Sequence, residues 1–204
     1  MPQRDYEAES RLKEALCNIS FSRFRTLNPV YLKTVDSTQE YVSKVLKSKR
    51  EGDLAISEIQ TAGKGREGRV WESDKGGVWM TITLKPDAPE MLGNLSLTIV
   101  KSVASTLENY GAENCVVKPP NDIYCNQKKI GGVLVDSVIT GQECLAYVGI
   151  GVNVNNDVRT NESIAKIAIS LKEILGKEIS LVEFIVSLLK NLDREYAAMF
   201  SASK

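Results

Sequence analysis

The sequence predicts an α+β fold in which helices pack on a mixed, largely antiparallel β-sheet. Two observations predict it: strand-like segments come in pairs joined by short hairpin turns, and segments with helical periodicity are grouped between and after them. A length of 204 residues fits one domain with a sizeable core, or one domain and a small appendage. We therefore expect one sheet and one main hydrophobic core.

Strands are predicted where β-branched and apolar residues alternate or run together between turn residues. The predicted strands are residues 30–35, 53–60, 77–84, 115–118, 123–125, 129–139 and 144–154. Asn126-Gln127 and Thr140-Gly141 are the expected hairpin turns. Four of the seven strands would thus follow one another closely in the second half of the chain.

Helices are predicted where apolar residues recur at i, i+3 and i+4, with polar residues at the ends that can cap them. The predicted helices are residues 7–16, 36–49, 92–110, 164–175 and 180–199. Ser37 with Glu40, and Ser180 with Glu183, have the spacing of capping boxes. The apolar stripes of the last two helices are interpreted as core. The stripe of helix 164–175 includes Ile164, Ile167 and Ala168, and that of helix 180–199 consists of Phe184, Leu188, Leu192, Tyr196 and Met199.

The charge and composition narrow the classes of function. Because 26 basic residues balance 26 acidic ones, no overall field favours nucleic acid or a membrane surface. The chain has no histidine, which leaves acid–base chemistry to Lys, Asp, Glu or the substrate. The N-terminus is charged and no run of about 18 apolar residues occurs. We expect a cytoplasmic protein without DNA or membrane partners.

The cysteines indicate no metal site. Cys17, Cys115, Cys125 and Cys144 are scattered, without a C-x-x-C pair, which argues against structural zinc. We expect all of them to be buried free thiols in a reducing compartment.

Residues 60–77, QTAGKGREGRVWESDKGG, form the most informative segment. Gly63, Gly65 and Gly68 match the G-x-G-x-x-G dinucleotide pattern, but that site needs a helix after the glycines, and here a turn and a strand follow. No P-loop pattern occurs. The segment is therefore predicted to be a flexible cationic loop between two strands. Its guanidinium and ammonium groups suit phosphate oxygens, and Trp71 suits a purine ring.

A second unusual segment is Lys-Pro-Pro-Asn-Asp at residues 118–122. Two prolines restrict the backbone, and asparagine and aspartate can bind their own backbone, so a simple turn explains the segment. The alternative is a rigid edge that presents Lys118, Asn121 and Asp122 to a ligand.

Two further segments carry glycines inside predicted strands. In residues 128–134, KKIGGVL, the paired lysines are explained by a solvated strand edge, yet beside two glycines Lys129 is also a candidate for stabilising developing negative charge. In residues 149–155, GIGVNVN, alternate glycines leave one strand face bare. Protein or ligand must pack against that face.

The order of these segments resembles the catalytic domain of biotin–protein ligases. The matching segments are the Ser-Thr pair at 37–38, the glycine–arginine–tryptophan loop, Lys-Pro-Pro-Asn-Asp, Lys-Lys-Ile-Gly-Gly and Gly-Ile-Gly-Val-Asn. The resemblance extends from about Tyr31 to Val154 and more loosely through the last helices. It implies the fold shared with class II aminoacyl-tRNA synthetases, with an N-terminal extension at 1–30 and the catalytic domain at 31–204.

The resemblance implies a two-step ligase that uses ATP, biotin and Mg²⁺. Biotin's carboxylate attacks the α-phosphate of ATP to give biotinyl-5′-AMP and pyrophosphate, and a lysine of a biotin carboxyl carrier domain then takes the biotinyl group. Preorganised cations offset the repulsion between carboxylate and polyphosphate. No histidine base is needed, because a carboxylate is already ionised at neutral pH. A homodimer formed through a sheet edge is compatible with the family.

The resemblance also assigns site residues. The biotin-binding set is Ser37, Thr38, Gln39, Gln60, Gly63, Lys64, Gly65, Arg66, Lys129, Gly131, Gly132 and Leu134. The ATP-binding set is Lys64, Arg69, Trp71, Lys118, Asn121, Asp122 and Asn153. Lys129 and Arg66 take the catalytic roles, Trp71 stacks on adenine, and Asp122 is the candidate contact to Mg²⁺, which otherwise binds through the ATP phosphates.

Four positions depart from the family pattern: Gln39 replaces Asn, Lys64 replaces Arg, Asp74 replaces Pro, and Pro119 replaces Trp. Lys64 keeps the charge but loses the bidentate fork, and Pro119 removes a large aromatic ring. The chain ends at Lys204, where relatives continue into a small C-terminal β-domain. Its N-terminal residues are too few for a winged-helix DNA reader.

Two other functions are alternatives to an active biotin–protein ligase. The first is a non-catalytic protein that binds biotin or biotinyl-AMP. The second is a related acyl ligase such as a lipoate–protein ligase, against which the arginine loop argues.

Overall fold

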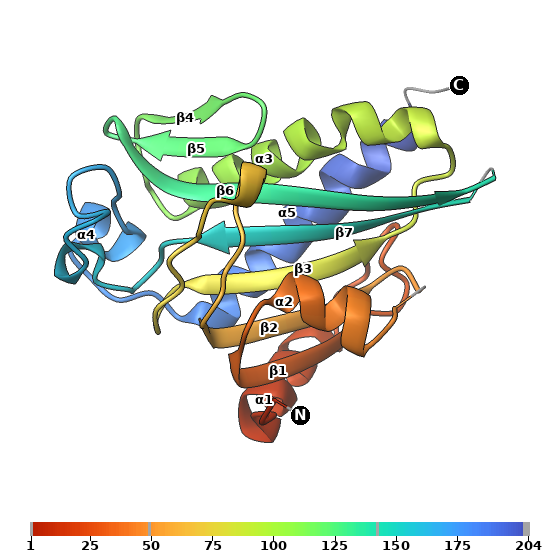
Figure 1. Cartoon of the computed structure of the whole chain (residues 1–204), viewed down its shortest axis with the longest axis horizontal. Helices are drawn as coiled ribbons and strands as arrows, with labels where there is room; N and C mark the ends of the chain where they lie inside the picture. The colour runs from red at the N-terminus through yellow and green to blue at the C-terminus, as the bar shows by residue number, and fades with distance from the viewer. Residues whose placement is uncertain (1, 49, 142, 202–204) are drawn as a thin grey trace.

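A mixed sheet of seven strands forms the centre of the computed structural model, which describes residues 2–48, 50–141 and 143–201 (Figure 1). The strands are β1 (Asn28–Val35), β2 (Asp53–Gln60), β3 (Val78–Leu84), β4 (Cys115–Lys118), β5 (Asp122–Cys125), β6 (Lys128–Thr140) and β7 (Glu143–Val152). Their order is β1-β2-β3-β7-β6-β5-β4. Among the neighbouring pairs of these strands, as far as the structure describes them, only β1–β2 is parallel. The predicted α+β class is confirmed.

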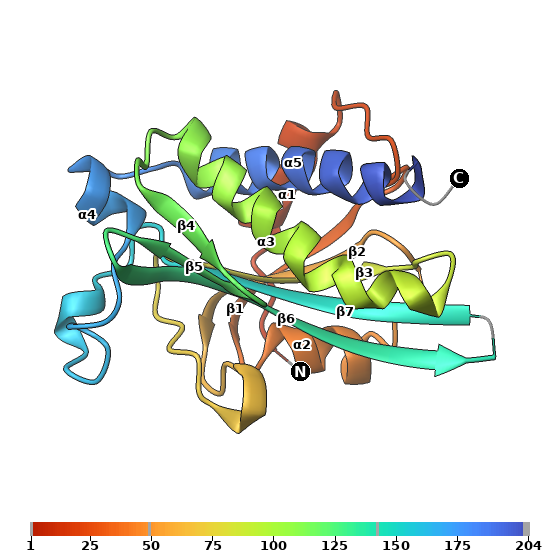
Figure 2. The same cartoon turned by 90° about the horizontal axis from the view of Figure 1, so that it is seen from above.

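Helical segments cover both faces of this sheet. They are α1 (Tyr6–Leu16), α2 (Thr38–Glu40), the π-helix η1 (Tyr41–Val45), η2 (Arg66–Gly68), η3 (Pro89–Met91), α3 (Leu92–Asn109), η4 (Val158–Thr160), α4 (Leu171–Leu175) and α5 (Leu181–Ser201). Figure 2 shows α1, α3 and α5 on one face, and α2 with the 61–77 loop on the other. The long helices α3 and α5 cover the core on one face of the sheet, and short elements and loops lie on the opposite face.

The main core lies between the sheet and α3 and α5. Phe184, Leu188, Leu192 and Tyr196 of α5 are fully buried there, as their spacing predicted. The N-terminal residues join the same core through Leu12 and Leu16 of α1. Residues 3–5 also bind the free edge of β1, where Asp5 N–H donates to the Tyr31 carbonyl. No helix of the described residues is long and apolar enough to cross a membrane.

The predicted strands agree with the structure to within two residues at each end. The predicted helices at 7–16 and 92–110 are confirmed as α1 and α3. Gly176 ends α4 in the left-handed conformation with φ +69°, as expected for a glycine after a helix. Ser180 accepts from the Glu183 amide at 3.4 Å, at the start of α5.

Two predicted helices were wrong. The helix at 36–49 ends at Val45, and Ser37 makes no capping bond because it faces a cavity; Lys49 lies outside the described residues. The helix at 164–175 is reduced to α4, whose capping box is formed by Ser170 and Glu173. Residues 167–169 instead pair with Lys129 of β6, whose N–H donates to the Ile167 carbonyl and whose carbonyl accepts from Ile169 N–H. Tertiary strand pairing outweighed the local helical pattern.

The cysteine prediction was wrong for one pair. Cys115 and Cys125 form a disulfide between β4 and β5, where they are direct partners in the register. Cys17 is a free thiol but exposed, and only Cys144 is the buried free thiol that was expected. Spacing of these residues along the sequence does not reveal strand register, which is what brings the two sulfurs together.

Candidate active site

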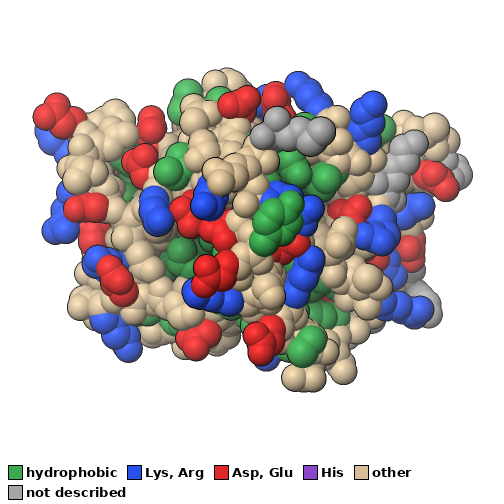
Figure 3. Space-filling view, turned by 90° about the horizontal axis from the view of Figure 1, so that it is seen from below, with side chains coloured by type: hydrophobic (Ala, Val, Ile, Leu, Met, Phe, Trp, Pro, Cys, Tyr) green, Lys and Arg blue, Asp and Glu red, His purple; other side chains and the backbone are tan. Residues whose placement is uncertain are grey.

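A cavity of about 320 Å³ lies between the sheet and the loop that joins β2 to β3. This volume is in the range of small-ligand sites. It is lined by Ser37, Thr38, Gln39, Gln60, Lys64, Gly65, Arg66, Arg69, Val70, Trp71, Glu72, Met80, Thr81, Asn121, Asp122, Tyr124, Lys129, Gly132, Val133, Leu134, Gly149, Ile150, Gly151, Asn153, Ile164, Ile167 and Ala168. Figure 3, a view from below the orientation of Figure 1, shows acidic and basic side chains interspersed over the surface.

The register of the strands builds the cavity floor in two rows. Thr81, Gly149 and Leu134 are neighbours across β3, β7 and β6 and form one row. Gly151 and Gly132 lie two residues further along, beside Asp122 of β5, and form the second. Since side chains alternate between faces of a strand, both rows project to the side opposite α3 and α5.

The glycines of the second row make room for an indole ring. A Cβ added to Gly151 would lie 2.6 Å from Trp71 Nε1, and one added to Gly132 would lie 3.2 Å from Trp71 Cζ3. Trp71 therefore packs directly on the backbone of β6 and β7. The prediction that protein or ligand packs against the bare face at 149–155 is confirmed: in this structure it is protein.

One end of the cavity is lined by uncharged side chains that form a hydrogen-bond network. Gln60 Oε1 accepts from the backbone N–H and the hydroxyl of Thr38, at 2.8 and 3.0 Å. Gln39 Oε1 accepts from Thr81 Oγ1 at 3.1 Å. Its Nε2 donates to the Tyr147 carbonyl at 2.7 Å and to the Asp136 carboxylate, outside the cavity lining, at 3.1 Å. Gly149 is needed here, because a Cβ at that position would lie 2.6 Å from Gln39 Oε1. These bonds fix the amide orientations at this end.

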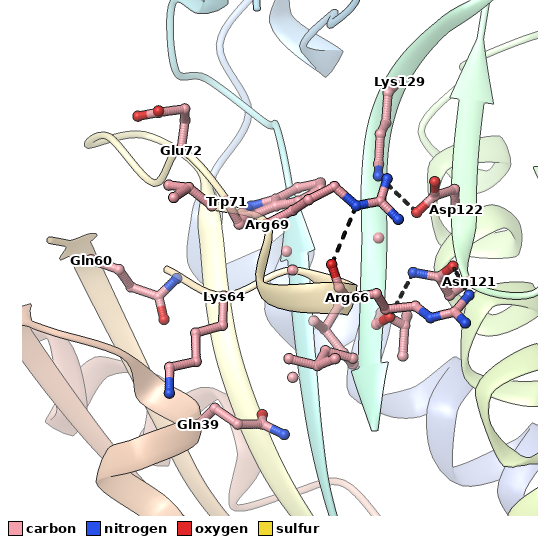
Figure 4. Close-up of a pocket in the computed structure, with 18 of the residues that line it drawn as sticks. Gln39, Gln60, Lys64, Arg66, Arg69, Trp71, Glu72, Asn121, Asp122 and Lys129 are labelled. Carbon is pink, nitrogen blue, oxygen red and sulfur yellow. Dashed lines mark hydrogen bonds and ion pairs between the residues drawn. The ribbon is translucent and has the colours of Figure 1, made fainter. Parts of the chain in front are cut away.

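The other end of the cavity is charged. Lys129 Nζ lies 2.8 Å from the Asp122 carboxylate and 5.0 Å from the centroid of the Trp71 ring. Arg66 Nη1 donates to Asn121 Oδ1 at 3.2 Å, and Asn121 Nδ2 in turn donates to the Val133 carbonyl. Figure 4 shows the side chains of Lys129, Arg66, Asn121 and Asp122 grouped together, opposite Gln39 and Gln60. Segments distant in the sequence thus converge at this end of the cavity.

Only one of the four cavity cations lacks an acidic partner among the described residues. Lys129 pairs with Asp122, Lys64 pairs with Glu40, and Arg69 pairs with Glu67. Among the described residues, the Arg66 guanidinium hydrogen-bonds only to the neutral amide of Asn121. The unneutralised positive charge of the cavity is therefore centred on Arg66, which is the natural position for an anionic ligand group.

Lys64 points away from this charged end. Its ammonium binds Glu40, which also pairs with Lys44 at 3.1 Å. The hydrogen bond from Lys64, and then the one from Lys44, lower the pKa of Glu40. These groups are exposed, so the pair contributes little to stability. Its effect is to hold the base of the loop against α2.

Three of the predicted site residues do not line the cavity: Gly63, Lys118 and Gly131. Gly63 instead lets the loop close, since its added Cβ would lie 2.3 Å from the Trp71 carbonyl oxygen. Lys118 lies over the ring of Tyr124, with Nζ 5.0 Å from the centroid. Gly131 is one residue from Gly132 and so faces the opposite side of the sheet, near Ile123. The alternation of strand faces explains this last difference.

The chain belongs to a known group of enzymes by sequence. The family model "Biotin/lipoate A/B protein ligase family" matches residues 31–155. This chain is a member of that family. The residues matched include the loop, the charged end of the cavity and both rows of the floor.

Relatives of this ligase-family chain are similar over most of its length. The bifunctional ligase/repressor BirA of Bacillus subtilis is 32% identical over 172 residues, which cover 82% of this chain and 53% of that protein. Biotin–protein ligase 2 of Arabidopsis thaliana is 33% identical over 77% of this chain and 49% of its own length. The chain thus spans about half the length of the curated relatives it matches.

Solved structures of the family share its fold. The biotin protein ligase of Aquifex aeolicus, in complex with biotin and ATP, superposes with a TM-score of 0.71 and 34% identity. The match covers 82% of this chain and 69% of that one. The seven-stranded sheet with its helices is therefore the architecture of biotin protein ligases.

Sequence reasoning missed several cavity residues of this family member. Ile164, Ile167 and Ala168 were interpreted as a core-facing helical stripe, but they line the cavity, and Ile167 is 62% exposed. The paired backbone at Lys129 turns this segment toward the site. Met80 and Thr81 were also missed, because every residue of β3 is buried and no polar pattern separates its two faces.

A bound metal would have to rely on few protein ligands. The described residues contain no group of three or more His, Cys, Asp or Glu side chains arranged to hold a metal ion. Asp122 is the carboxylate beside Lys129 in the charged end. One carboxylate suits Mg²⁺ when it arrives with a polyphosphate, because this ion keeps mainly water and phosphate ligands.

Proposed function

We propose that this protein activates biotin with ATP to biotinyl-5′-AMP and transfers the biotinyl group to a lysine of a biotin carboxyl carrier protein, with an amide bond formed and AMP released. The observation that carries the proposal is the shared cavity in which Arg66, from the loop, and Lys129, from β6, approach the same space. A neutral end and a cationic end in one cavity suit a ligand with an uncharged ring and an acid group.

The uncharged ring of biotin would occupy the neutral end. Thr38, Gln39 and Gln60 are held there by hydrogen bonds, and Leu134 supplies apolar surface beside them. Ser37 also lines this end and is buried, and its hydroxyl has no hydrogen-bond partner among the described residues. Its hydroxyl is therefore available to a ureido group, which needs both donors and acceptors.

The acid group would then reach the cationic end. The carboxylate oxygen attacks the α-phosphorus, a new oxygen–phosphorus bond forms, and the bond to the β-phosphate oxygen breaks as pyrophosphate leaves. Arg66 is free of acidic partners and would bind the carboxylate or the α-phosphate. Lys129 would exchange its contact with Asp122 for the same oxygens. Fixed cations of this kind stabilise charge that accumulates in the transition state.

Asp122 and Asn121 would hold Mg²⁺ together with the ATP phosphates. When bound, the ion neutralises part of the phosphate charge. Asp122 would become available to it as Lys129 turns to the substrate. Trp71 would leave the glycine floor and stack on adenine, since it belongs to a loop rather than to the core.

The carrier protein is the proposed macromolecular partner, with the reaction taking place in the cytoplasm and without DNA. The balance of charges over the chain supports a partner other than nucleic acid.

The distal half of β6 extends beyond β5 and exposes Val138 and Ile139. This free edge supports a homodimer formed by strand pairing.

The two competing functions are less well supported. A protein that only binds biotin or biotinyl-AMP has little need of Arg66 and Lys129 in one cavity. A lipoate–protein ligase would not need the arginine loop with Trp71.

Biotin-dependent exchange between ATP and pyrophosphate tests the proposal, with lipoate as the competing acid. The unmodified protein should catalyse exchange with biotin. Lys129→Ala and Arg66→Ala should each lower the rate by at least about 100-fold, the scale of losing one charge-stabilising group. Lys128→Ala is the matched control, because this neighbouring lysine does not line the cavity.

Each outcome has a clear meaning. Exchange with lipoate alone would indicate the related acyl ligase, and exchange with neither acid would indicate the binding protein. Equal rates for Lys129→Ala and Lys128→Ala would overturn the catalytic assignment. Thermal unfolding of each variant shows whether a loss of rate reflects a loss of fold.

A further inference from the structure

Three asparagines follow β7 in the sequence Asn153-Val-Asn-Asn156, and their side chains have different surroundings. Asn155 anchors the segment. Its Nδ2 donates to the Ile179 carbonyl at 2.7 Å, and its Oδ1 accepts from the Ile179 N–H at 2.9 Å. Its backbone N–H also donates to the Gly76 carbonyl at 2.7 Å. These bonds fix the path of the chain on both sides of the segment.

The backbone of Asn153 is equally fixed. Its N–H donates to the Ile130 carbonyl at 2.8 Å, and its carbonyl accepts from Leu171 N–H at 3.0 Å. Its side chain is 5% exposed and lines the cavity, on the strand end that adjoins Lys129 and Ala168. Asn153 Oδ1 accepts from Asn156 Nδ2 at 3.0 Å, while its own Nδ2 has no hydrogen-bond partner among the described residues.

Asn156 does not line the cavity and is also 5% exposed. Its donor is committed to Asn153, whereas its own Oδ1 is buried with no partner among the residues the structure describes. A buried amide oxygen without a donor is unfavourable, so the residue is not explained by stability alone. Asn156 is also held in place, since its backbone packs against Gly76, where an added Cβ would lie 2.8 Å from Asn156 N.

We propose that Asn156 is a positioning residue that turns the NH₂ group of Asn153 toward the cavity, where it donates to an acceptor atom of the bound nucleotide. An amide carries its acceptor and its donors on opposite sides, so binding the oxygen on one side presents the donors on the other. The acceptor is a phosphate, ribose or ring-nitrogen lone pair. This inference rests on the proposed function, because it assigns the end of the cavity beside Lys129 to ATP.

Asn156→Leu removes the donor while keeping a similar volume, and it tests the proposal in the exchange assay. The KM for ATP should rise about 10-fold, the scale of one lost hydrogen bond, whereas the KM for biotin should change less than about twofold. Asn153→Ala should raise the KM for ATP by a similar factor. In the double variant the increase should equal that of Asn153→Ala alone, because Asn156 acts only through Asn153.

Asn191→Leu is the matched control. Asn191 is another buried asparagine with one side-chain hydrogen bond, to Thr106 Oγ1 at 2.9 Å, on the helical side of the sheet. The Asn191→Leu substitution should lower the thermal stability without changing the KM for ATP or the KM for biotin. An unchanged KM for ATP in Asn156→Leu would overturn the proposal. So would equal increases in both KM values, or effects that multiply to about 100-fold in the double variant.

The failure of this inference is distinguishable from failure of the proposed function. If the unmodified protein shows no exchange, the proposed function is overturned, and calorimetric titration with ATP replaces KM by Kd. The Kd for ATP should then rise in the variants by the same factors as those expected for the KM for ATP. Absence of ATP binding by the unmodified protein would overturn both.

Discussion

Replacing Gly151 by alanine tests whether Trp71 packs on the bare face of the sheet. The added methyl carbon would lie 2.6 Å from Trp71 Nε1 and 2.7 Å from Trp71 Cε2, whereas ordinary contacts begin at 3.4 Å. The indole must therefore move by roughly 1 Å or leave the floor. Because Trp71 belongs to a loop, leaving is the easier response, so the free energy of unfolding should fall by only about 1 kcal/mol, the lower end for overpacking.

Tryptophan fluorescence follows this change directly. The protein has two tryptophans, and Trp79 is fully buried with its Nε1 bound to the Asp74 carbonyl. Emission from Gly151→Ala should therefore shift to the red mainly through Trp71, whose ring lies edge-on to Trp79 with centroids 6.5 Å apart. Ligand binding should weaken because the methyl group enters the cavity. Gly93→Ala is the control, since among the described residues no atom beyond its own stretch of α3 backbone lies within 4 Å of its added Cβ. Identical emission and stability of the two variants would refute the packing argument.

Two further predictions concern stability. Burial alone raises the pKa of Glu9, but hydrogen bonds from Arg4 and Lys13 outweigh it, so its pKa is lowered from 4.5. The ionised Glu9 carboxylate contributes its full stabilisation above 4.5, the pKa of the unfolded state. This stabilisation is lost as the pH falls through the lower pKa of the folded state. Urea denaturation of Glu9→Gln from about pH 3 to 7 should show reduced stability at neutral pH and a flatter acid slope, and a slope like that of the unmodified protein would contradict this origin. Reducing the Cys115–Cys125 disulfide should lower the free energy of unfolding by about 2–3 kcal/mol, the scale for a short closed loop. Alkylation of the unreduced, denatured protein that labels all four cysteines would show that the bond does not form.

The sequence was sufficient for most of the secondary structure and for the composition of the site. Strand limits were predicted well because glycines and turn residues interrupt the apolar runs, a signal that each segment carries locally. The cationic loop and the glycine-containing strands were recognised for the same reason. The prediction that the cationic loop lies between two strands is confirmed, because β2 and β3 lie on either side of residues 61–77.

Contacts between distant residues were decided only by the tertiary structure. Strand register pairs Cys115 with Cys125, and the alternation of faces gives Gly132 to the cavity and Gly131 to the core. Pairing with Lys129 prevents the predicted helix at 164–175 from forming over its first half. Neither register nor long-range pairing has a local signal in a single sequence, because both depend on how elements far apart in the chain pack together.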